Sequence, residues 1–446
     1  MKDSITSADL KKYQTAFAKD PKNLVAMNAA TKNGVHNAAA RWDALAEYQH
    51  SFTIDIESGD VTNQKNSGRC WMFAALNVMR LAVMKKLNLK NMELSQSYPL
   101  FYDKLEKANY FLENILATLD EPLDGRVVSF LLEGPLNDGG QWDMFRSLVA
   151  KYGVVPKEVM PDSENASNTT MMNKHLTTKL REYACQLRTH AADGATMTQL
   201  RKEKDQMMTT VYQILCISLG QPPEKFSWGA TDKKRKHVSV TDMTPQAFFK
   251  KYVGWNLDDY VTVINAPTAD KPYGNTFTVK HLGSVWGGAY PVKYLNLPME
   301  DLRELTLAQL KNDEIVWFGS DVGQFSDRDN GFLCLDAYDL QGLFGTDFPM
   351  DKAQRLDYGE SLMTHAMAIT GVELDKKGKP LRWKVENSWG KEPGKDGYYV
   401  MSDAWFGEFA YQILLNKKYF SAQQRKQWET DPIELAPWDP MGSLAW

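Results

Sequence analysis

Cys70 stands where a loop meets a helix. The residues before it, NSGR (66–69), are typical of a turn, and the apolar residues after it predict a long helix over 70–89. A cysteine in the first turn of a helix lies near unpaired backbone N–H groups and the positive end of the helix dipole, which lower the pKa of its thiol. The thiolate is the reactive form, so this position predicts a nucleophile. Position alone favours a buried core thiol, and it is the neighbouring sequence that favours the nucleophile instead.

His365 and Asn387 supply what a thiol nucleophile needs. His365 opens the apolar segment HAMAITGV, and Asn387 ends the strand-like segment LRWKVEN. If neighbouring strands end together, the Asn387 side chain can accept a hydrogen bond from one ring nitrogen of His365. That bond would fix the tautomer and aim the other nitrogen at Cys70. Trp389 can cover the bond and keep water away from it.

Gln64 lies six residues before Cys70, in a loop rich in Gly, Asn and Ser. Its side-chain amide and the backbone N–H of Cys70 could together stabilise an oxyanion. A lone loop glutamine is more often a solvated residue, so this assignment depends on Cys70 being the nucleophile.

The other cysteines offer no comparable site. Cys185 and Cys216 fall within amphipathic helices and Cys334 within an apolar segment, so all three are expected to be buried core thiols. No Cys/His spacing matches a zinc site, and we expect neither a metal nor an organic cofactor.

The elements that must position these residues change type along the chain. Helical periodicity is strongest over 1–50, 70–89, 97–119 and 141–152, and short apolar strands separated by turns follow from about residue 255. A short strand is also expected within 51–57. This order, helices first and strands last, predicts an α+β fold.

Composition limits the class of protein. The 446 residues are 43% hydrophobic and 24% charged, with a net charge of −4, which excludes disordered and collagen-like chains and gives no general attraction to nucleic acid or membranes. The start of the chain has no apolar signal segment, no apolar run is long enough to span a membrane, and four cysteines are too few for a disulfide scaffold. A cytoplasmic protein is therefore expected.

Three motifs together resemble those of the papain-type cysteine peptidases, and more narrowly of the bleomycin hydrolase/aminopeptidase C branch. They are QKNSGRCWMFAA (64–75), THAMAITGV (364–372) and VENSWG (385–390), in that order. The segment LNDGGQWDMF, the polar helical stretch at 161–240 and the ending APWDPMGSLAW also fit this branch. The resemblance therefore covers essentially the whole chain.

The resemblance implies a role for each residue of the site. Cys70 would be the nucleophile, His365 the general base and acid, Asn387 its orienter and Gln64 the oxyanion donor. Gly139 and Gly140 match a Gly-Gly segment that pairs with the substrate backbone; without the resemblance they would be read as an ordinary turn. The implied activity is that of a cytosolic cysteine aminopeptidase acting on peptides.

The same resemblance implies a two-lobed papain-like core in a homo-hexamer. The expected parts are an N-terminal helical or arm segment, a helical lobe, a helical insertion used in oligomerisation, a β-rich lobe and a C-terminal arm, spanning 1–60, 61–160, 161–240, 241–435 and 436–446. A stripe in the insertion, Met207, Val211 and Leu215, could form the contact between subunits, or could pack within its own chain. The basic run KKRK (233–236) is read as a solvated loop, and no nucleic acid is expected as a partner.

The C-terminal arm is implied to lie in the active-site cleft, with its carboxylate near the substrate's N-terminal ammonium. Arms that act this way commonly finish near Ala445, and this chain continues to Trp446. Trp446 could be trimmed, could occupy a specificity pocket, or could shift the enzyme toward internal cleavage.

Two rival functions follow from the same residues. One is an oligo-endopeptidase of the same branch. The other, from a different class, is a non-catalytic assembly or nucleic-acid-binding protein that kept the fold. Loss of Cys70, His365 or Asn387 would have favoured the second, and all three are present.

Overall fold

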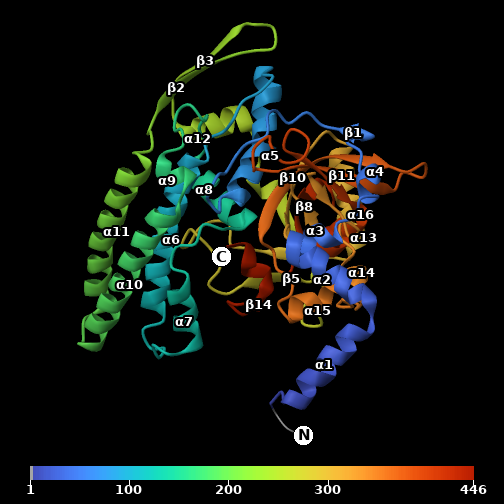
Figure 1. Cartoon of the computed structure of the whole chain (residues 1–446). Coiled ribbons are helices and arrows are strands. Elements are labelled where there is room, and N and C mark those ends of the chain that lie inside the picture. Colours follow the sequence, from blue (N-terminus) through green and yellow to red (C-terminus); the bar gives the residue numbers. More distant parts are fainter. Residues whose placement is uncertain (1–3, 446) are drawn as a thin grey trace.

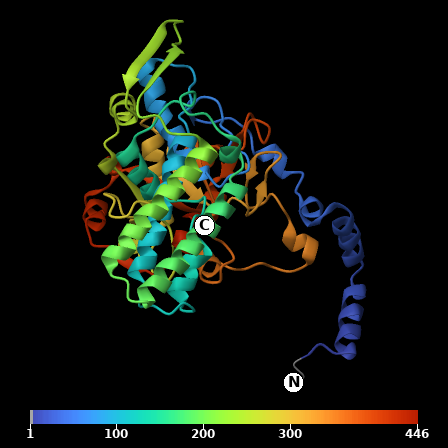
Figure 2. The ribbon, with the colours of Figure 1, turned by 90° about the vertical axis from the view of Figure 1, so that its left-hand side faces the viewer.

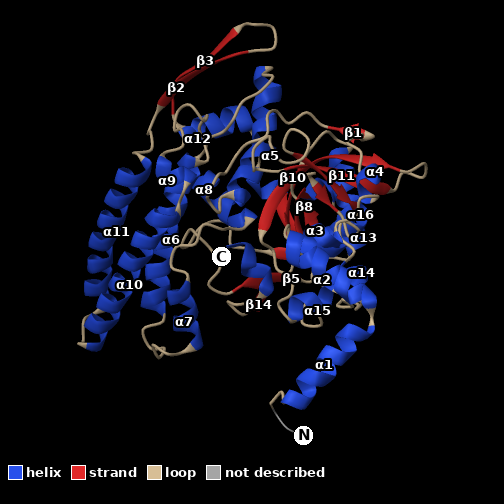
Figure 3. Cartoon of the chain, in the orientation of Figure 1, coloured by secondary structure: helices blue, strands red, loops and turns tan. Residues whose placement is uncertain are grey.

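The longest helices lie together on one side of the molecule, and a large sheet with shorter helices around it lies on the other, so the expected α+β class is confirmed (Figure 1, Figure 3). The computed structural model describes residues 4–445, apart from the side chains of residues 45 and 47. Trp446 therefore lies outside the described residues. Within them, no helix has both the length and the apolar character needed to cross a membrane.

The helical lobe is built around α5, whose first residue is Cys70. Almost every side chain of its first three turns is buried, because apolar residues surround the whole helix rather than one stripe. Its neighbours follow closely in sequence, and the helices expected at 70–89, 97–119 and 141–152 are confirmed. The lobe comprises α5 (Cys70–Leu87), α6 (Ser97–Ala117), α7 (Arg126–Glu133) and α8 (Trp142–Tyr152).

Two long helices and a β-hairpin occupy the polar stretch that follows. Their order is α9 (Glu164–Ser167), α10 (Thr170–Ala192), α11 (Met197–Leu219), β2 (Phe226–Thr231) and β3 (His237–Met243). The hairpin, which stands out at the top of Figure 1, was not expected in this stretch. The KKRK run (233–236) forms its exposed tip.

The stripe Met207, Val211 and Leu215 packs within its own chain. All three side chains are buried, on the face of α11 that lies against α6 and α10. A contact between subunits through these residues is therefore wrong, and the intramolecular alternative holds. The helix begins with a capping box between Thr196 and Gln199 and ends at Gly220, whose φ of 84° suits a residue without a side chain.

One twelve-stranded sheet forms the β-rich lobe. Its strands run in the order β14-β5-β6-β4-β13-β7-β10-β11-β12-β9-β8, and β1 pairs with β10. The strands are β1 (Ile54–Asp55), β4 (Tyr260–Ile264), β5 (Thr276–Val279), β6 (Tyr294–Asn296), β7 (Val316–Ser320), β8 (Ser326–Asp327), β9 (Phe332–Leu333), β10 (His365–Leu374), β11 (Pro380–Glu386), β12 (Tyr398–Ser402), β13 (Ala410–Asn416) and β14 (Ile433–Leu435). The short strand expected within 51–57 is thus confirmed as β1.

Short helices complete the chain around the sheet. They are α12 (Pro245–Phe248), a π-turn (Phe249–Val253), α13 (Met299–Leu310), α14 (Leu340–Phe344), α15 (Lys352–Asp357), α16 (Asp403–Phe409), α17 (Ala422–Trp428) and three 3₁₀ turns at Leu257–Asp259, Lys417–Tyr419 and Pro440–Ala445. Four N-terminal helices, α1 (Ser7–Lys19), α2 (Pro21–Asn33), α3 (Val35–Ala39) and α4 (Ala44–Glu47), precede the helical lobe. In both views α1 projects away from the body of the molecule (Figure 1, Figure 2).

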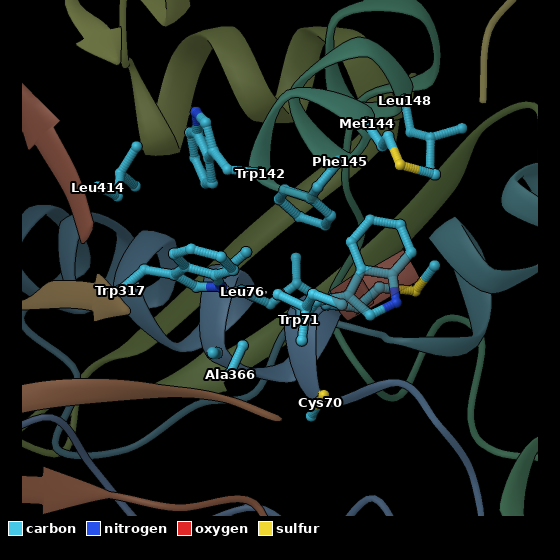
Figure 4. Close-up of a cluster of buried hydrophobic side chains, with 14 of the residues drawn as sticks. Cys70, Trp71, Leu76, Trp142, Met144, Phe145, Leu148, Trp317, Ala366 and Leu414 are labelled. Carbon is cyan, nitrogen blue, oxygen red and sulfur yellow. Dashed lines mark hydrogen bonds between the residues drawn. The ribbon is translucent and has the colours of Figure 1, made fainter. Parts of the chain in front are cut away.

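Strand register brings the candidate site residues to one place. β10 begins at His365, which stands opposite Ser320 of β7, and its other neighbour β11 ends one residue before Asn387. α5 packs against β10, so the helix that begins at Cys70 and the strand that begins at His365 meet at the junction of the two lobes. Figure 4 shows Cys70 and Ala366 at the edge of the cluster of buried side chains that fills this junction.

Candidate active site

Cys70 is the first residue of α5, and only 5% of it is exposed. Burial raises the pKa of its thiol to about 11, whereas the backbone N–H groups of Ala366, Trp71 and Cys70 itself act to lower it. The helix-start amides therefore act in the expected direction, but burial outweighs them. The influence of Ala366 agrees with the packing of α5 against β10, which brings Cys70 near the first residues of that strand.

His365 and Asn387 form the hydrogen bond that the strand ends were expected to allow. Nε2 of His365 lies 2.8 Å from Oδ1 of Asn387. The same oxygen accepts from the Ser388 N–H at 2.7 Å, which fixes it as the acceptor. Nε2 must therefore carry the proton, and Nδ1 is left with a lone pair in the neutral ring. That second nitrogen is the one free to take a proton from a thiol.

Two side chains cover this hydrogen bond. The Trp389 ring centroid lies 4.8 Å from that of His365, and the Arg328 guanidinium lies over Trp389 at 4.7 Å. His365 is 4% exposed, and burial lowers its pKa to about 4 against the opposing effect of the Asn387 hydrogen bond. The surroundings thus favour a neutral thiol and a neutral imidazole.

Gln64 is tied to the strand end that carries Asn387. Its backbone N–H donates to the Ser388 carbonyl at 2.8 Å, and its side-chain oxygen accepts from the Ser388 hydroxyl at 2.6 Å. One amide hydrogen of Gln64 goes to the Ser67 carbonyl, 2.6 Å away. An amide nitrogen carries two hydrogens, so the second stays available to an oxyanion.

We expect acid to destabilise the fold partly through His365. The unfolded side chain takes up a proton near its ordinary pKa of 6.5, whereas the folded one resists protonation down to about pH 4. The contribution of His365 to the stability is therefore present in full above pH 6.5, and it is lost as the pH falls from 6.5 toward about 4. Between pH 7 and pH 5 this group alone should remove about 2 kcal/mol from the free energy of unfolding.

Urea unfolding of the natural protein and of His365→Gln at the two pH values measures this loss. The variant should lose about 2 kcal/mol less than the natural protein between pH 7 and pH 5, because all other titrating groups are common to both. Equal losses in the two proteins would contradict the assignment.

The Gly139–Gly140 segment lies between the nucleophile helix and the end of the chain. A Cβ on Gly140 would come within 2.6 Å of the Trp71 ring, and one on Gly139 would overlap the Leu444 carbonyl. Both positions therefore require glycine for close approach. The Gly139 carbonyl accepts a hydrogen bond from the buried Lys107 ammonium at 2.6 Å, and this bond fixes the orientation of the peptide group between Gly139 and Gly140.

Asp138 joins this segment to three other parts of the protein, and sequence reasoning missed it. Its carboxylate accepts from the Gly68 N–H at 3.0 Å, from Lys104 at 2.6 Å, and from Asn173 of α10 at 2.6 Å, with Thr169 as a further partner. Although burial opposes ionisation, the Lys104 ammonium and these hydrogen bonds hold the pKa of Asp138 well below its ordinary value. The sequence around Asp138 shows only the turn-like segment DGG, which says nothing about such partners.

The C-terminal arm follows β14 and runs into the space between the lobes, where the C label lies in Figure 1. Gln141 and the Tyr294 hydroxyl both donate to the Met441 carbonyl at 3.2 Å, and the Ser443 hydroxyl donates to the Met363 carbonyl at 2.9 Å. Ala445 lines a pocket that also contains Lys107 and Met144. The structure thus places Ala445 beside the Gly139 segment.

The remaining cysteines match the expectation of buried core thiols to different degrees. Cys334 is buried as expected, Cys216 is half-buried, and Cys185 is exposed. The prediction of a core thiol is therefore wrong for Cys185, because this residue lies on the outer face of α10, between the buried positions Tyr183 and Leu187.

Comparisons with known proteins match nearly the whole chain to peptidases of one family. Residues 4–442 match the Peptidase C1-like family. The chain is 50% identical to the aminopeptidase C of Streptococcus thermophilus over 94% of each chain, and 40% identical to the bleomycin hydrolase of Rattus norvegicus over 96% of each. The crystal structure of PepW from Lactobacillus rhamnosis HN001 superposes with a TM-score of 0.97 at 49% identity, covering 99% of both chains.

Proposed function

The chain belongs to the Peptidase C1-like family and is a cysteine aminopeptidase, and from this premise we propose that Cys70 is its nucleophile, His365 its general base and acid, Asn387 the orienter of His365 and Gln64 an oxyanion donor. The observation that carries the assignment is the hydrogen bond from His365 Nε2 to Asn387 Oδ1, at the start of the strand β10 that packs against the helix α5 of Cys70.

The proposed reaction begins with a neutral pair. As the Cys70 sulfur attacks the peptide carbonyl carbon, its proton passes to Nδ1 of His365, and the Cys70 N–H and Gln64 stabilise the oxyanion. The C–N bond then breaks as His365 returns the proton to the leaving amine. Water attacks the thioester with His365 as base, the C–S bond breaks, and the thiol is restored.

Gly139 and Gly140 are proposed to pair with the substrate backbone, since neither has a side chain to block an extended peptide. The arm occupies the far end of the same segment, with Leu444 and Ala445 against Gly139. We propose that it closes the non-primed side of the cleft, so that only a peptide whose chain begins there can reach Cys70. Trp389 would border the cleft beside His365.

Alkylation with iodoacetamide, mapped residue by residue by mass spectrometry, tests the nucleophile. Loss of peptidase activity should follow modification of Cys70 and should be slowed by a competing peptide. Exposed Cys185 should also be modified, but the Cys185→Ser variant should keep full activity and the same rate of inactivation. Inactivation that follows another cysteine would remove Cys70 from the mechanism.

We also propose a cytoplasmic homo-hexamer in which the N-terminal helices and the insertion make contacts between subunits. Support comes from α1 and α2, which bury no side chain in their own chain and expose apolar residues. These residues are Leu10, Tyr13, Phe17, Leu24 and Val25. The native mass in solution tests the assembly, and a monomer of 50.7 kDa would contradict it.

A further inference from the structure

The arm is held by contacts of two kinds. Gln141 and Tyr294 hold it through the Met441 carbonyl, and every residue has a carbonyl, so an arm displaced by one residue could keep both hydrogen bonds. A contact that fixes the register must involve a particular side chain. Trp438 stacks against the Arg126 guanidinium at 3.6 Å, but it lies at the surface and is 38% exposed.

Asp439 makes a buried, charged contact that depends on its own side chain. Its Oδ2 lies 2.8 Å from the Lys271 ammonium, and the two side chains are 8% and 3% exposed. Its Oδ1 accepts from the Met441 N–H at 2.9 Å, which begins the 3₁₀ turn Pro440–Ala445. One carboxylate therefore both anchors the arm and starts the turn that leads to its end.

Lys271 is itself firmly placed. It lies in the loop between β4 and β5, its backbone carbonyl accepts from the fully buried Asn296 at 2.6 Å, and its ammonium has a second partner in Asp270 at 2.8 Å. Burial acts to lower the pKa of Lys271, but the two carboxylates outweigh it and hold the pKa above its ordinary value. The ammonium thus presents a fixed positive charge to the arm.

Asp439 lies at a fixed distance along the chain from Ala445, near the end of the arm. Six residues separate Asp439 from Ala445, and at a rise of about 2.0 Å per residue a 3₁₀ turn of this length spans about 12 Å. On the other side of the anchor, β14 pairs with β5, and the Lys280 N–H donates to the Leu435 carbonyl at 3.0 Å. A slip of one residue at Asp439 would move the end of the arm along the Gly139 segment.

We propose that the buried Lys271–Asp439 ion pair fixes the register of the C-terminal arm and thereby makes Lys271 and Asp439 positioning residues for exopeptidase specificity. The inference rests on the proposed role of the arm. Without the pair, the arm would occupy several registers, and longer or N-terminally blocked peptides would gain access to Cys70.

The test compares kcat/KM for a free peptide and for its N-acetylated form in Lys271→Met and Asp439→Asn. The second variant keeps an oxygen for the Met441 N–H and removes only the charge. Each should lower the free-to-acetylated ratio by at least about tenfold, whereas Lys271→Arg, which keeps the charge, should stay within about threefold of the natural protein. The matched control is Lys280→Met, which breaks the exposed Lys280–Glu434 pair on the same sheet edge and should leave the ratio within twofold.

A protein lacking residues 440–446, measured alongside, separates the possible failures. If its ratio falls while those of Lys271→Met and Asp439→Asn stay unchanged, the arm acts as proposed but the ion pair does not set its register. An equal loss of both activities in these variants, with an unchanged ratio, would mean a merely structural role and would also overturn the inference. If the truncated protein keeps the natural ratio, the proposed function of the arm itself fails.

Discussion

Replacing Cys70 by serine lowers kcat/KM for release of an N-terminal residue by at least about 10⁴-fold, with the fold unchanged. The hydroxyl has nearly the shape of the thiol, but its proton is far harder to remove. The surroundings of Cys70 offer only a neutral imidazole whose own pKa is lowered by burial to about 4. The site therefore has little capacity to activate an alcohol.

Kinetics on a chromogenic amino-acid amide measure this loss, and thermal unfolding checks that the variant is folded. Cys185→Ser is the control, since that thiol is exposed on α10 and plays no part in the site. A Cys70→Ser protein that is folded and retains more than one per cent of the activity would refute the nucleophile assignment.

Deleting residues 440–446 converts the aminopeptidase toward an endopeptidase. The deletion removes the 3₁₀ turn that lies against Gly139, and with it the barrier that we propose on the non-primed side. The deletion also removes the arm's carboxylate, which is expected to pair with the N-terminal ammonium of the substrate. We therefore expect kcat/KM for free peptides to fall by about thirtyfold or more, the range for losing one partner of a sheltered charge pair. Cleavage of N-acetylated peptides should rise at the same time.

Digestion of matched free and acetylated peptides, with products identified by mass, reads out both changes. A protein lacking only Trp446 is the control for the length of the arm, and it also shows whether that last residue obstructs or assists the natural activity. If deletion of 440–446 leaves the cleavage positions unchanged, the arm does not select the peptide end.

Local sequence signals predicted which residues come together at the candidate site. Cys70, His365, Asn387 and Gln64 carry their chemistry in their residue types, and three of them sit at the ends of elements that periodicity predicts. The structure brings His365, Asn387 and Gln64 into one hydrogen-bonded group through Ser388. Ser388 could have been suspected only as part of the Asn-Ser-Trp-Gly motif.

Contacts between distant segments could not be predicted. The partners of Asp138 come from positions 68, 104, 169 and 173, and no pattern in any one segment points to the others. The ionisation of the thiol also depends on tertiary burial, which reverses the effect of the helix start on Cys70. The β2–β3 hairpin, by contrast, shows alternating burial along Phe226–Thr231, a two-residue period that the neighbouring charged residues obscured.

The carboxylate of Asp138 has a consequence for redesign of this peptidase. Through Asn173 and Thr169 it takes hydrogen bonds from the outlying helical region, and through Gly68 it braces the loop that presents the nucleophile. Trimming the enzyme to a minimal two-lobed scaffold would leave the buried carboxylate of Asp138 short of hydrogen-bond donors, one residue before the glycines that we propose to bind the peptide. The outlying helices thus support the candidate active site through these hydrogen bonds, and a shortened enzyme would need other donors to Asp138 in their place.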